Sequence, residues 1–204
     1  MADKFLDRVY DHSTPEDTSA LYDAWAATYD AEVAENGYAT PGRVAEALFK
    51  YLSEPDEPIL DFGCGTGLSG LALKLVGFST VDGMDPSPEM IDLARKRGAY
   101  RTISVLDIQD DAPVAQGAYR AITAIGVIGT GAAPASTFDL LMRALPKGGL
   151  LGFSLNDHAL SDPQYEGALC QWLDCGAGRL LFKKYGTHLP GQDLKSNVYI
   201  IEKA

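Results

Sequence analysis

The segment ILDFGCGTGLSG, residues 59–70, has four glycines within eight positions directly after a short apolar run. Glycines let the backbone approach a ligand closely, and the N-terminus of a following helix would face the same ligand. Glycine-rich turns of this kind commonly bind phosphate. Asp61 stands just before the first glycine, however, and its carboxylate would repel a phosphate group. The chemistry of this turn therefore depends on what else lies beside it.

Two further carboxylates, Asp85 and Asp107, come at the ends of the next two β-rich segments. In open α/β sheets the ligand binds beyond the carboxyl ends of the strands, near the point where the strand order reverses. We therefore expect Asp61, Asp85 and Asp107 to converge on one crevice.

A dinucleotide is one interpretation of this crevice. Residues 65–70, GTGLSG, satisfy the pattern G-x-G-x-x-G, and Asp85 follows at about the required 20 residues. The register is wrong, because two turn residues already precede Gly65. A pyrophosphate beside Asp61 would also cost on the order of a few kcal/mol. A cofactor with a cationic head and an adenosine body fits better, and S-adenosylmethionine has both parts.

Alternating strands and helices position these residues. We expect strands over 58–62, 79–85, 100–108, 119–129 and 148–156, and helices over 68–76, 88–97 and 136–145. Residues 178–190 and 195–204 predict an antiparallel hairpin, and residues 14–36 and 40–52 predict helices, the second capped by Thr40. The fold class is therefore α/β, a doubly wound, mostly parallel, seven-stranded Rossmann-like sheet with N-terminal lid helices.

The length of the chain indicates its domain organisation, and its net charge limits the classes of partner that it could bind. The 204 residues predict a single domain, with the lid helices in 1–56 and the Rossmann-like core in 57–204. A net charge of −11 disfavours nucleic acid and anionic membranes, and no segment approaches the roughly 18 apolar residues of a membrane span. We expect a cytoplasmic protein. The cysteines and histidines have no metal-type spacing, so no metal is expected.

The motifs together resemble those of class I S-adenosylmethionine-dependent methyltransferases. Residues 59–67, ILDFGCGTG, resemble the glycine motif; residues 83–95, GMDPSPEMIDLAR, resemble the motif with the ribose-binding acid; and residues 106–108, LDI, resemble the adenine-facing motif. More narrowly, YDAWAATYD at 22–30 and LPGQDL at 189–194 resemble the methyltransferase-like proteins named after the Williams-Beuren syndrome chromosomal region. The resemblance covers about residues 22–204.

This resemblance implies a role for each matching residue. Asp61 would hold the ammonium group directly or through water, Asp85 the two ribose hydroxyls, and Asp107 the adenine amino group. Tyr29, on one helix face with Tyr22 and Trp25, would reach the cofactor carboxylate as part of a lid. The whole expected cofactor site comprises Tyr22, Tyr29, Asp61, Gly63, Cys64, Gly65, Gly67, Asp85, Pro86, Met90, Asp107, Ile108, Gly126 and Val127.

The function implied is in-line methyl transfer to an acceptor, with S-adenosylhomocysteine as product. The segment GVIGTGAAP at 126–134 lacks the motifs typical of adenine, amide-nitrogen or cytosine-carbon methylation, which favours a small-molecule acceptor over a protein side chain. His158 and Asp157 are candidate catalytic residues, although the activated sulfonium does not itself require a base. The alternatives are a non-catalytic cofactor-binding protein and an NAD(P)-binding oxidoreductase.

Overall fold

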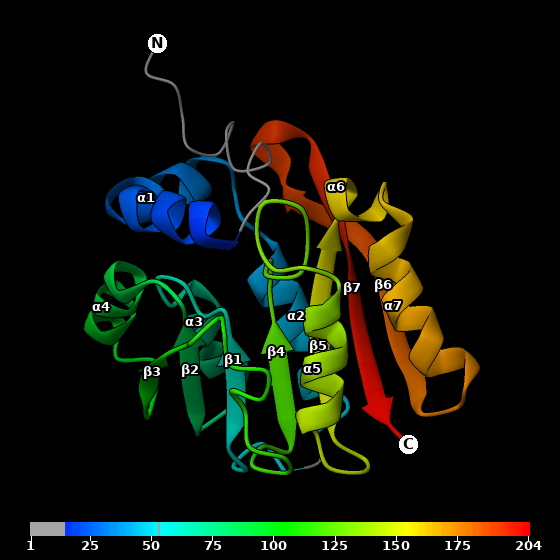
Figure 1. The fold of residues 1–204 in the computed structure, drawn as a ribbon. Coiled ribbons are helices and arrows are strands. Elements are labelled where there is room, and N and C mark those ends of the chain that lie inside the picture. The colour runs from blue at the N-terminus through cyan, green and yellow to red at the C-terminus, as the bar shows by residue number, and fades with distance from the viewer. Residues whose placement is uncertain (1–14, 53) are drawn as a thin grey trace.

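The computed structural model describes residues 15–52 and 54–204, with the side chains of 15–23 and of residue 27 left outside that description. One seven-stranded sheet has the order β3-β2-β1-β4-β5-β7-β6 (Figure 1). Strands β1 to β5 are parallel, and β7 runs antiparallel to both β5 and β6. The bounds are Ile59–Phe62, Val81–Asp85, Ile103–Val105, Ala121–Ala124, Leu150–Asn156, Gly178–Leu189 and Leu194–Lys203 for β1 to β7. The predicted fold class is confirmed.

The helices begin and end largely where local signals place them. In α4 the Ser87 hydroxyl accepts a hydrogen bond from Met90 N at 3.1 Å, and Gly98 ends the helix in the left-handed conformation. Gly77 ends α3 in the same way, with a φ of 118°. The helices are α1 Pro15–Glu35, α2 Thr40–Phe49, α3 Leu68–Val76, α4 Pro88–Arg97, α5 Ser136–Ala144, α6 Asp157–Leu160 and α7 Pro163–Asp174.

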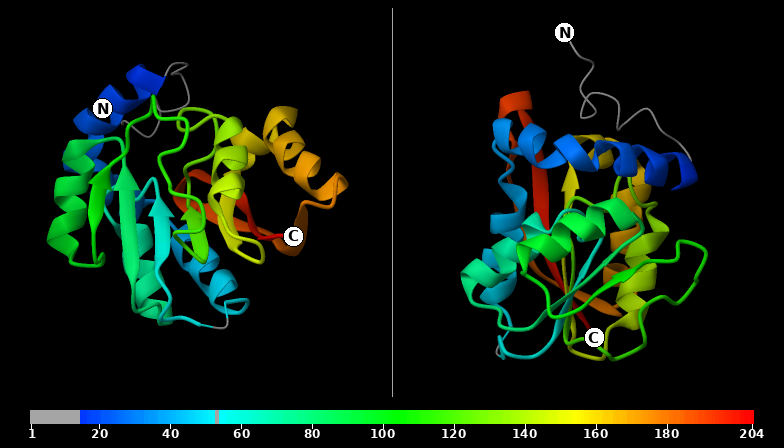
Figure 2. Two further views of the ribbon diagram at one scale, coloured as in Figure 1. Left: turned by 60° about the horizontal axis from the view of Figure 1, so that its bottom comes forward. Right: turned by 90° about the vertical axis from the view of Figure 1, so that its left-hand side faces the viewer.

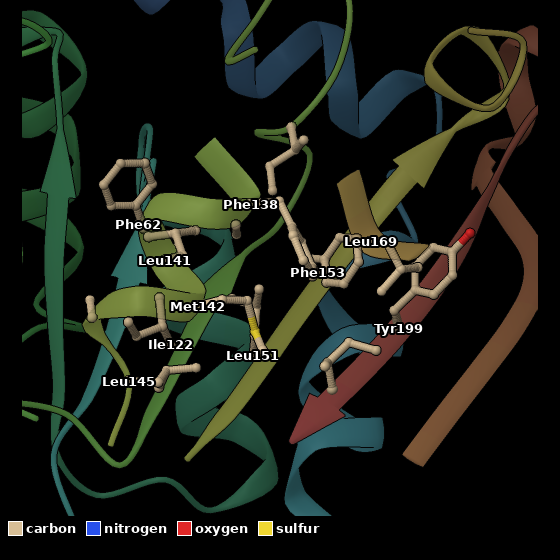
Figure 3. Close-up of a cluster of buried hydrophobic side chains, with 14 of the residues drawn as sticks. Phe62, Ile122, Phe138, Leu141, Met142, Leu145, Leu151, Phe153, Leu169 and Tyr199 are labelled. Carbon is tan, nitrogen blue, oxygen red and sulfur yellow. The ribbon is translucent and has the colours of Figure 1, made fainter. Parts of the chain in front are cut away.

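Helices cover both faces of the sheet, as Figure 2 shows. On one face, α2 and α3 pack over apolar residues of β1, β2, β4, β5 and β7. On the other, α5 and α7 pack over the alternate residues of β1, β4, β5 and β7 (Figure 3). In this second cluster the Phe153 ring stacks on Tyr199 with a centroid distance of 4.8 Å, which fixes the hairpin to the parallel part of the sheet.

One local expectation is wrong, and two helices were not predicted. Thr40 does not cap α2: Ala39 occupies the cap position without a side-chain hydrogen bond, and the Thr40 hydroxyl bonds to the C-terminal hairpin instead. Residues 157–160 and 163–174 form α6 and α7, which the sequence patterns did not reveal. The signals for α7 are an Asp162 cap and Pro163 in the first turn.

Helix α1 lies across the carboxyl ends of the strands (Figure 1), whereas α2 packs against a face of the sheet. Asp30 attaches α1 to the structure beneath it. One carboxylate oxygen accepts from Thr66 Oγ1 at 2.6 Å, and the other pairs with Arg97, whose Nε donates to Thr66 O at 2.6 Å. No helix in the described part of the chain is both long and apolar enough to span a bilayer.

We expect Gly70→Ala to destabilise the protein. A Cβ at Gly70 in α3 would lie 2.2 Å from the Tyr100 ring, so the ring must move, at a cost of about 1–3 kcal/mol in the free energy of unfolding. Gly42→Ala in α2 is the matched control, because nothing lies within 4 Å of its Cβ, and there we expect stabilisation of about 0.5–1 kcal/mol. Urea unfolding measures both, and equal changes would contradict the expected steric role of Gly70.

Candidate active site

A cavity of about 590 Å³ opens at the carboxyl ends of β1, β2 and β4, beside α1. That volume lies within the range of small-molecule and cofactor sites. Strand β1 lies between β2 and β4, so the cavity occupies the switch point of the sheet. Among the residues expected at the cofactor site, those that line the cavity are Tyr29, Gly63, Gly65, Asp85, Pro86, Met90, Asp107, Ile108, Gly126 and Val127.

The glycine turn is closely packed between two strand ends. Gly63 has a φ of 71°, and a Cβ there would lie 2.4 Å from Val127 Cγ2. The amides of Gly63 and Cys64 both donate to Met84 O, at 2.8 and 3.0 Å. A side chain at Gly63 would therefore separate the turn from the end of β4.

Asp85 is fixed at the cavity wall by two backbone amides. Its Oδ2 accepts from Gly65 N at 2.8 Å, and its Oδ1 accepts from Ser87 N at 3.0 Å. The side chain is 7% exposed and lines the cavity. A carboxylate oriented in this way suits the hydroxyl groups of a ligand, because ionised acceptors form the stronger hydrogen bonds.

Asp61 lies beneath the turn and does not line the cavity. The residue is fully buried, and its oxygens accept from Ser69 Oγ at 2.5 Å, Tyr100 OH at 2.7 Å and Thr123 Oγ1 at 2.9 Å. Burial raises the pKa of Asp61, and these three hydrogen bonds oppose the rise. The expected contact with an ammonium group remains a prediction, while the described contacts hold strands and helix together.

Two other residues expected at the cofactor site, Cys64 and Gly67, belong to the glycine turn but lie away from the cavity. Cys64 is buried, and burial followed by the charges of Asp61 and Asp85 raises the pKa of its thiol, which does not suit a nucleophile. Gly67 has a φ of 92°, and a Cβ there would lie 3.0 Å from Arg97 Cδ. Neither residue lines the cavity. The side chain of Tyr22 is outside the described residues.

Asp107 and Ile108 lie at the outer wall of the cavity. Asp107 is exposed, and its Oδ1 accepts from Gln109 N at 2.9 Å, which closes a local Asx turn. Ile108 is 41% exposed beside it. The turn therefore holds an exposed acidic side chain beside an apolar one. Such a pair suits a nucleobase, which has a flat apolar face and a polar edge.

A second, smaller cavity of about 60 Å³ adjoins the first and shares Tyr29, Gly126 and Ala132 with it. It lies below α1, where Trp25 and Tyr29 meet edge to face at a centroid distance of 4.7 Å. Its polar lining includes Tyr38, Thr130, Ser154 and Asn156, which sequence reasoning missed, and His188, for which the sequence offered weaker support than for His158. The sequence could have indicated Ser154 and Asn156 as site residues, because both lie near the carboxyl end of the strand predicted over 148–156.

The candidate catalytic residues His158 and Asp157 are not brought to either cavity. Both lie in α6 rather than in a loop, and His158 is exposed. Asp157 accepts from Tyr185 OH at 2.7 Å and from Lys195 N at 2.8 Å. It therefore connects α6 to the hairpin.

His188, at the end of β6, is the histidine that lines the smaller cavity. It is 5% exposed, and its Nδ1 lies 2.7 Å from Thr40 Oγ1. Burial, together with the nearby charge of Arg43, lowers the pKa of His188 to about 4, and Asp157 opposes this shift. The imidazole is therefore neutral at pH 7.

Acidification should destabilise the native state through His188. An unfolded histidine titrates near pH 6.5, whereas the folded one titrates near pH 4, so the unfolded state binds more protons between these values and stability falls as the pH drops. The loss from this residue reaches about 3 kcal/mol by pH 4. We expect His188→Gln to remove this part of the acid sensitivity in urea unfolding at pH 7 and 4.5. Exposed His158→Gln is the control, and parallel profiles for wild type and His188→Gln would contradict the expected effect.

The sheet order and the cavity at its switch point define a Rossmann-like protein with a cavity at the carboxyl ends of its strands. Residues 33–193 match the family described as a methyltransferase domain. The human Methyltransferase-like protein 27 is 33% identical over 168 residues, which are 80% of this chain and 68% of that protein. The chain belongs to the S-adenosylmethionine-dependent methyltransferase family, which confirms the resemblance seen in its motifs.

Solved structures share the fold. The [4+2]-cyclase SpnF superimposes with a TM-score of 0.69 at 16% identity, covering 94% of this chain and 97% of that one. An S-adenosylmethionine-dependent methyltransferase of Thermotoga maritima, described as a possible histamine N-methyltransferase, superimposes with a TM-score of 0.63 at 17% identity, covering 91% and 99%. At these identities the likeness concerns the fold alone.

Proposed function

We propose that this protein binds S-adenosylmethionine in the larger cavity and transfers its methyl group to a small-molecule acceptor. The observation that carries the proposal is Asp85, which two backbone amides hold at the wall of a cavity at the switch point of the sheet. Membership of the methyltransferase family supports the same conclusion.

The lining residues fit this cofactor. Asp85 would accept from the ribose hydroxyls, while Pro86, Met90 and Ile108 would surround the adenine and Asp107 would accept from its amino group. Gly63 and Gly65 leave the backbone accessible to the methionine part. Gly126 and Val127 would lie at the reactive end, with Tyr29 closing the site from α1. When bound, the cofactor supplies a methyl group already activated on a sulfonium, so the protein's part is to align the reactants and exclude water.

The charges of the larger cavity favour this cofactor over a dinucleotide. The acidic lining residues are Asp85, Asp107, Asp110, Asp111 and Asp139, whereas Arg143 is the single basic one among the described residues and pairs with Asp139 at 2.7 Å. A pyrophosphate would meet like charges here, and a cationic amino acid head would not.

The size of the smaller cavity supports a small acceptor. A water molecule occupies roughly 10–15 Å³ on the same measure, so about 60 Å³ holds only a few non-hydrogen atoms. The cavity is covered by Trp25, Tyr29 and Val33 of α1. A site of this size beneath a helix accommodates the reacting group of a small molecule better than an extended polymer.

Asp85→Ala tests the cofactor assignment. The variant loses a charged acceptor for two ribose hydroxyls, each bond being worth roughly 1.5–3 kcal/mol, and we expect at least about tenfold weaker binding of S-adenosylmethionine in isothermal titration. Asp92→Ala in α4 is the control, since that exposed carboxylate pairs with Arg95 and does not line the cavity. Circular dichroism verifies that both variants fold. An unchanged dissociation constant in folded Asp85→Ala would refute the assigned role.

The same titrations separate the alternatives. Binding of NAD in preference to S-adenosylmethionine would favour an oxidoreductase. Binding of S-adenosylmethionine without release of S-adenosylhomocysteine, across a panel of small acceptors, would favour a non-catalytic protein or another use of the fold. Such uses exist, as the [4+2]-cyclase shows.

A further inference from the structure

A buried chain of hydrogen bonds runs from Arg43 to the histidine of the smaller cavity. Arg43 NH1 lies 2.9 Å from Ser196 Oγ, which lies 3.1 Å from Thr40 Oγ1, which lies 2.7 Å from His188 Nδ1. Ser196 and Thr40 are fully buried. Arg43 also donates to the carbonyl oxygens of Lys184, Thr187 and Ser196, so its guanidinium is fixed between α2 and the hairpin.

The donor in each of these hydrogen bonds can be assigned by starting from Arg43, at one end of the series. A guanidinium only donates, so Ser196 Oγ accepts from Arg43 and its own hydrogen goes to Thr40. Thr40 then donates to Nδ1 of His188. In the reverse order, the buried Ser196 hydroxyl would have no acceptor among the described residues, which would cost about 1–3 kcal/mol. Nδ1 of the neutral ring therefore accepts, and the proton resides on Nε2.

Nε2–H is available to a ligand. Thr40, the partner of Nδ1, does not line the smaller cavity, whereas His188 does. Among the described residues none accepts from Nε2. Ser154 provides a second donor, because its Oγ accepts from Gly126 N at 3.0 Å and its hydroxyl hydrogen is then free to bond to a ligand.

The described lining of the smaller cavity contains no Asp, Glu, Lys or Arg. Neither a protonated amine nor a carboxylate would therefore find a counter-charge in the lining itself, but the charge that acts most strongly on the His188 ring is the positive charge of Arg43, which favours an anion. His188 with its proton on Nε2 could not remove a proton from the acceptor. The cavity instead suits an oxygen acceptor that needs no deprotonation and receives two hydrogen bonds.

We propose that the smaller cavity binds the reacting group of the methyl acceptor and that this group is a carboxylate, held by Nε2–H of His188 and by the Ser154 hydroxyl. Arg43, Ser196 and Thr40 are positioning residues that fix the histidine tautomer. This assignment rests on the proposed methyltransferase function and adds the acceptor class.

Carboxylate methylation needs no base. An oxygen lone pair forms the new O–CH₃ bond, the electron pair of the broken S–CH₃ bond stays on sulfur, and the negative and positive charges cancel. No proton moves, and the product is a methyl ester. The donors of His188 and Ser154, in a lining whose described residues include no Asp, Glu or Lys, match these requirements.

The histidine tautomer can be measured on the protein without any ligand. Long-range ¹H–¹⁵N spectra of protein labelled with [¹⁵N]histidine distinguish a protonated from a bare ring nitrogen, and His188→Gln assigns the signal. We expect the Nε2–H form of His188 throughout pH 6–8. Thr40→Val removes the donor to Nδ1, and there we expect a mixture of tautomers. A wild-type His188 protonated at Nδ1 would overturn the proposal.

Binding tests the acceptor class. Wild type, His188→Phe and His188→Gln are titrated, in saturating S-adenosylhomocysteine, with two matched pairs: propionate against propylamine and benzoate against benzylamine. Phenylalanine keeps the ring and loses the N–H, whereas glutamine keeps an N–H donor near the same place. We expect the carboxylates to bind wild type, His188→Phe to bind them at least tenfold more weakly, and His188→Gln to stay within about threefold of wild type.

Each outcome has a distinct meaning. Equal affinity for amines and carboxylates, no carboxylate binding, or unchanged carboxylate affinity in His188→Phe would overturn the carboxylate assignment while S-adenosylhomocysteine still binds. Failure of wild-type protein to bind S-adenosylhomocysteine would overturn the proposed function itself, and the acceptor assignment with it. Formation of methyl benzoate or methyl propionate from S-adenosylmethionine would confirm the transfer.

Discussion

The buried carboxylate of Asp61 is the interaction on which the site depends. Its three donors come from different places in the fold: Ser69 in α3, Tyr100 in the segment before β3, and Thr123 in β4. A carboxylate buried without partners would cost several kcal/mol, so these hydroxyls must converge on it. The N-terminal turn of α3 adds its dipole, and Tyr100 OH also accepts from Gly70 N at 3.0 Å. The carboxylate thereby fixes helix, strand and connecting segment in one arrangement.

The glycine turn is held between two carboxylates with different roles. Asp61 fixes the elements beneath the turn, and Asp85 holds Gly65 N from the end of the neighbouring strand. Because Gly63 also packs directly on Val127, the turn cannot move away from β4 without opening the cavity. A rigid backbone surface of this kind is useful for a cofactor whose methyl group must be aligned rather than activated.

Local signals brought ten of the expected residues to the larger cavity, whereas few residues of the smaller cavity were predicted. Ser87 and Pro88 mark the start of α4 and Gly98 marks its end, because helix capping and the left-handed conformation depend on only a few neighbouring residues. The same transition from strand to helix placed Asp85 at the end of β2. Asp61 was expected at the cavity, but alternation along β1 directs its side chain to the face that carries α3 and Thr123. Thr40 resembles a helix cap in sequence, and only the folded hairpin reveals that its partner is His188, 148 residues away.

This division has a physical origin. The larger cavity is built from strand ends and turns, whose residue types are dictated by their own backbone conformation. The smaller cavity takes one wall from α1, one from β5 and the segment that follows β4, and one from the hairpin. The histidine in its described lining is oriented by Arg43 through two hydroxyls. No short motif can encode such a wall, since each side chain depends on partners far away in the chain. Substitutions there leave the glycine turn undisturbed, so under the proposed function the acceptor can change while the cofactor site is retained.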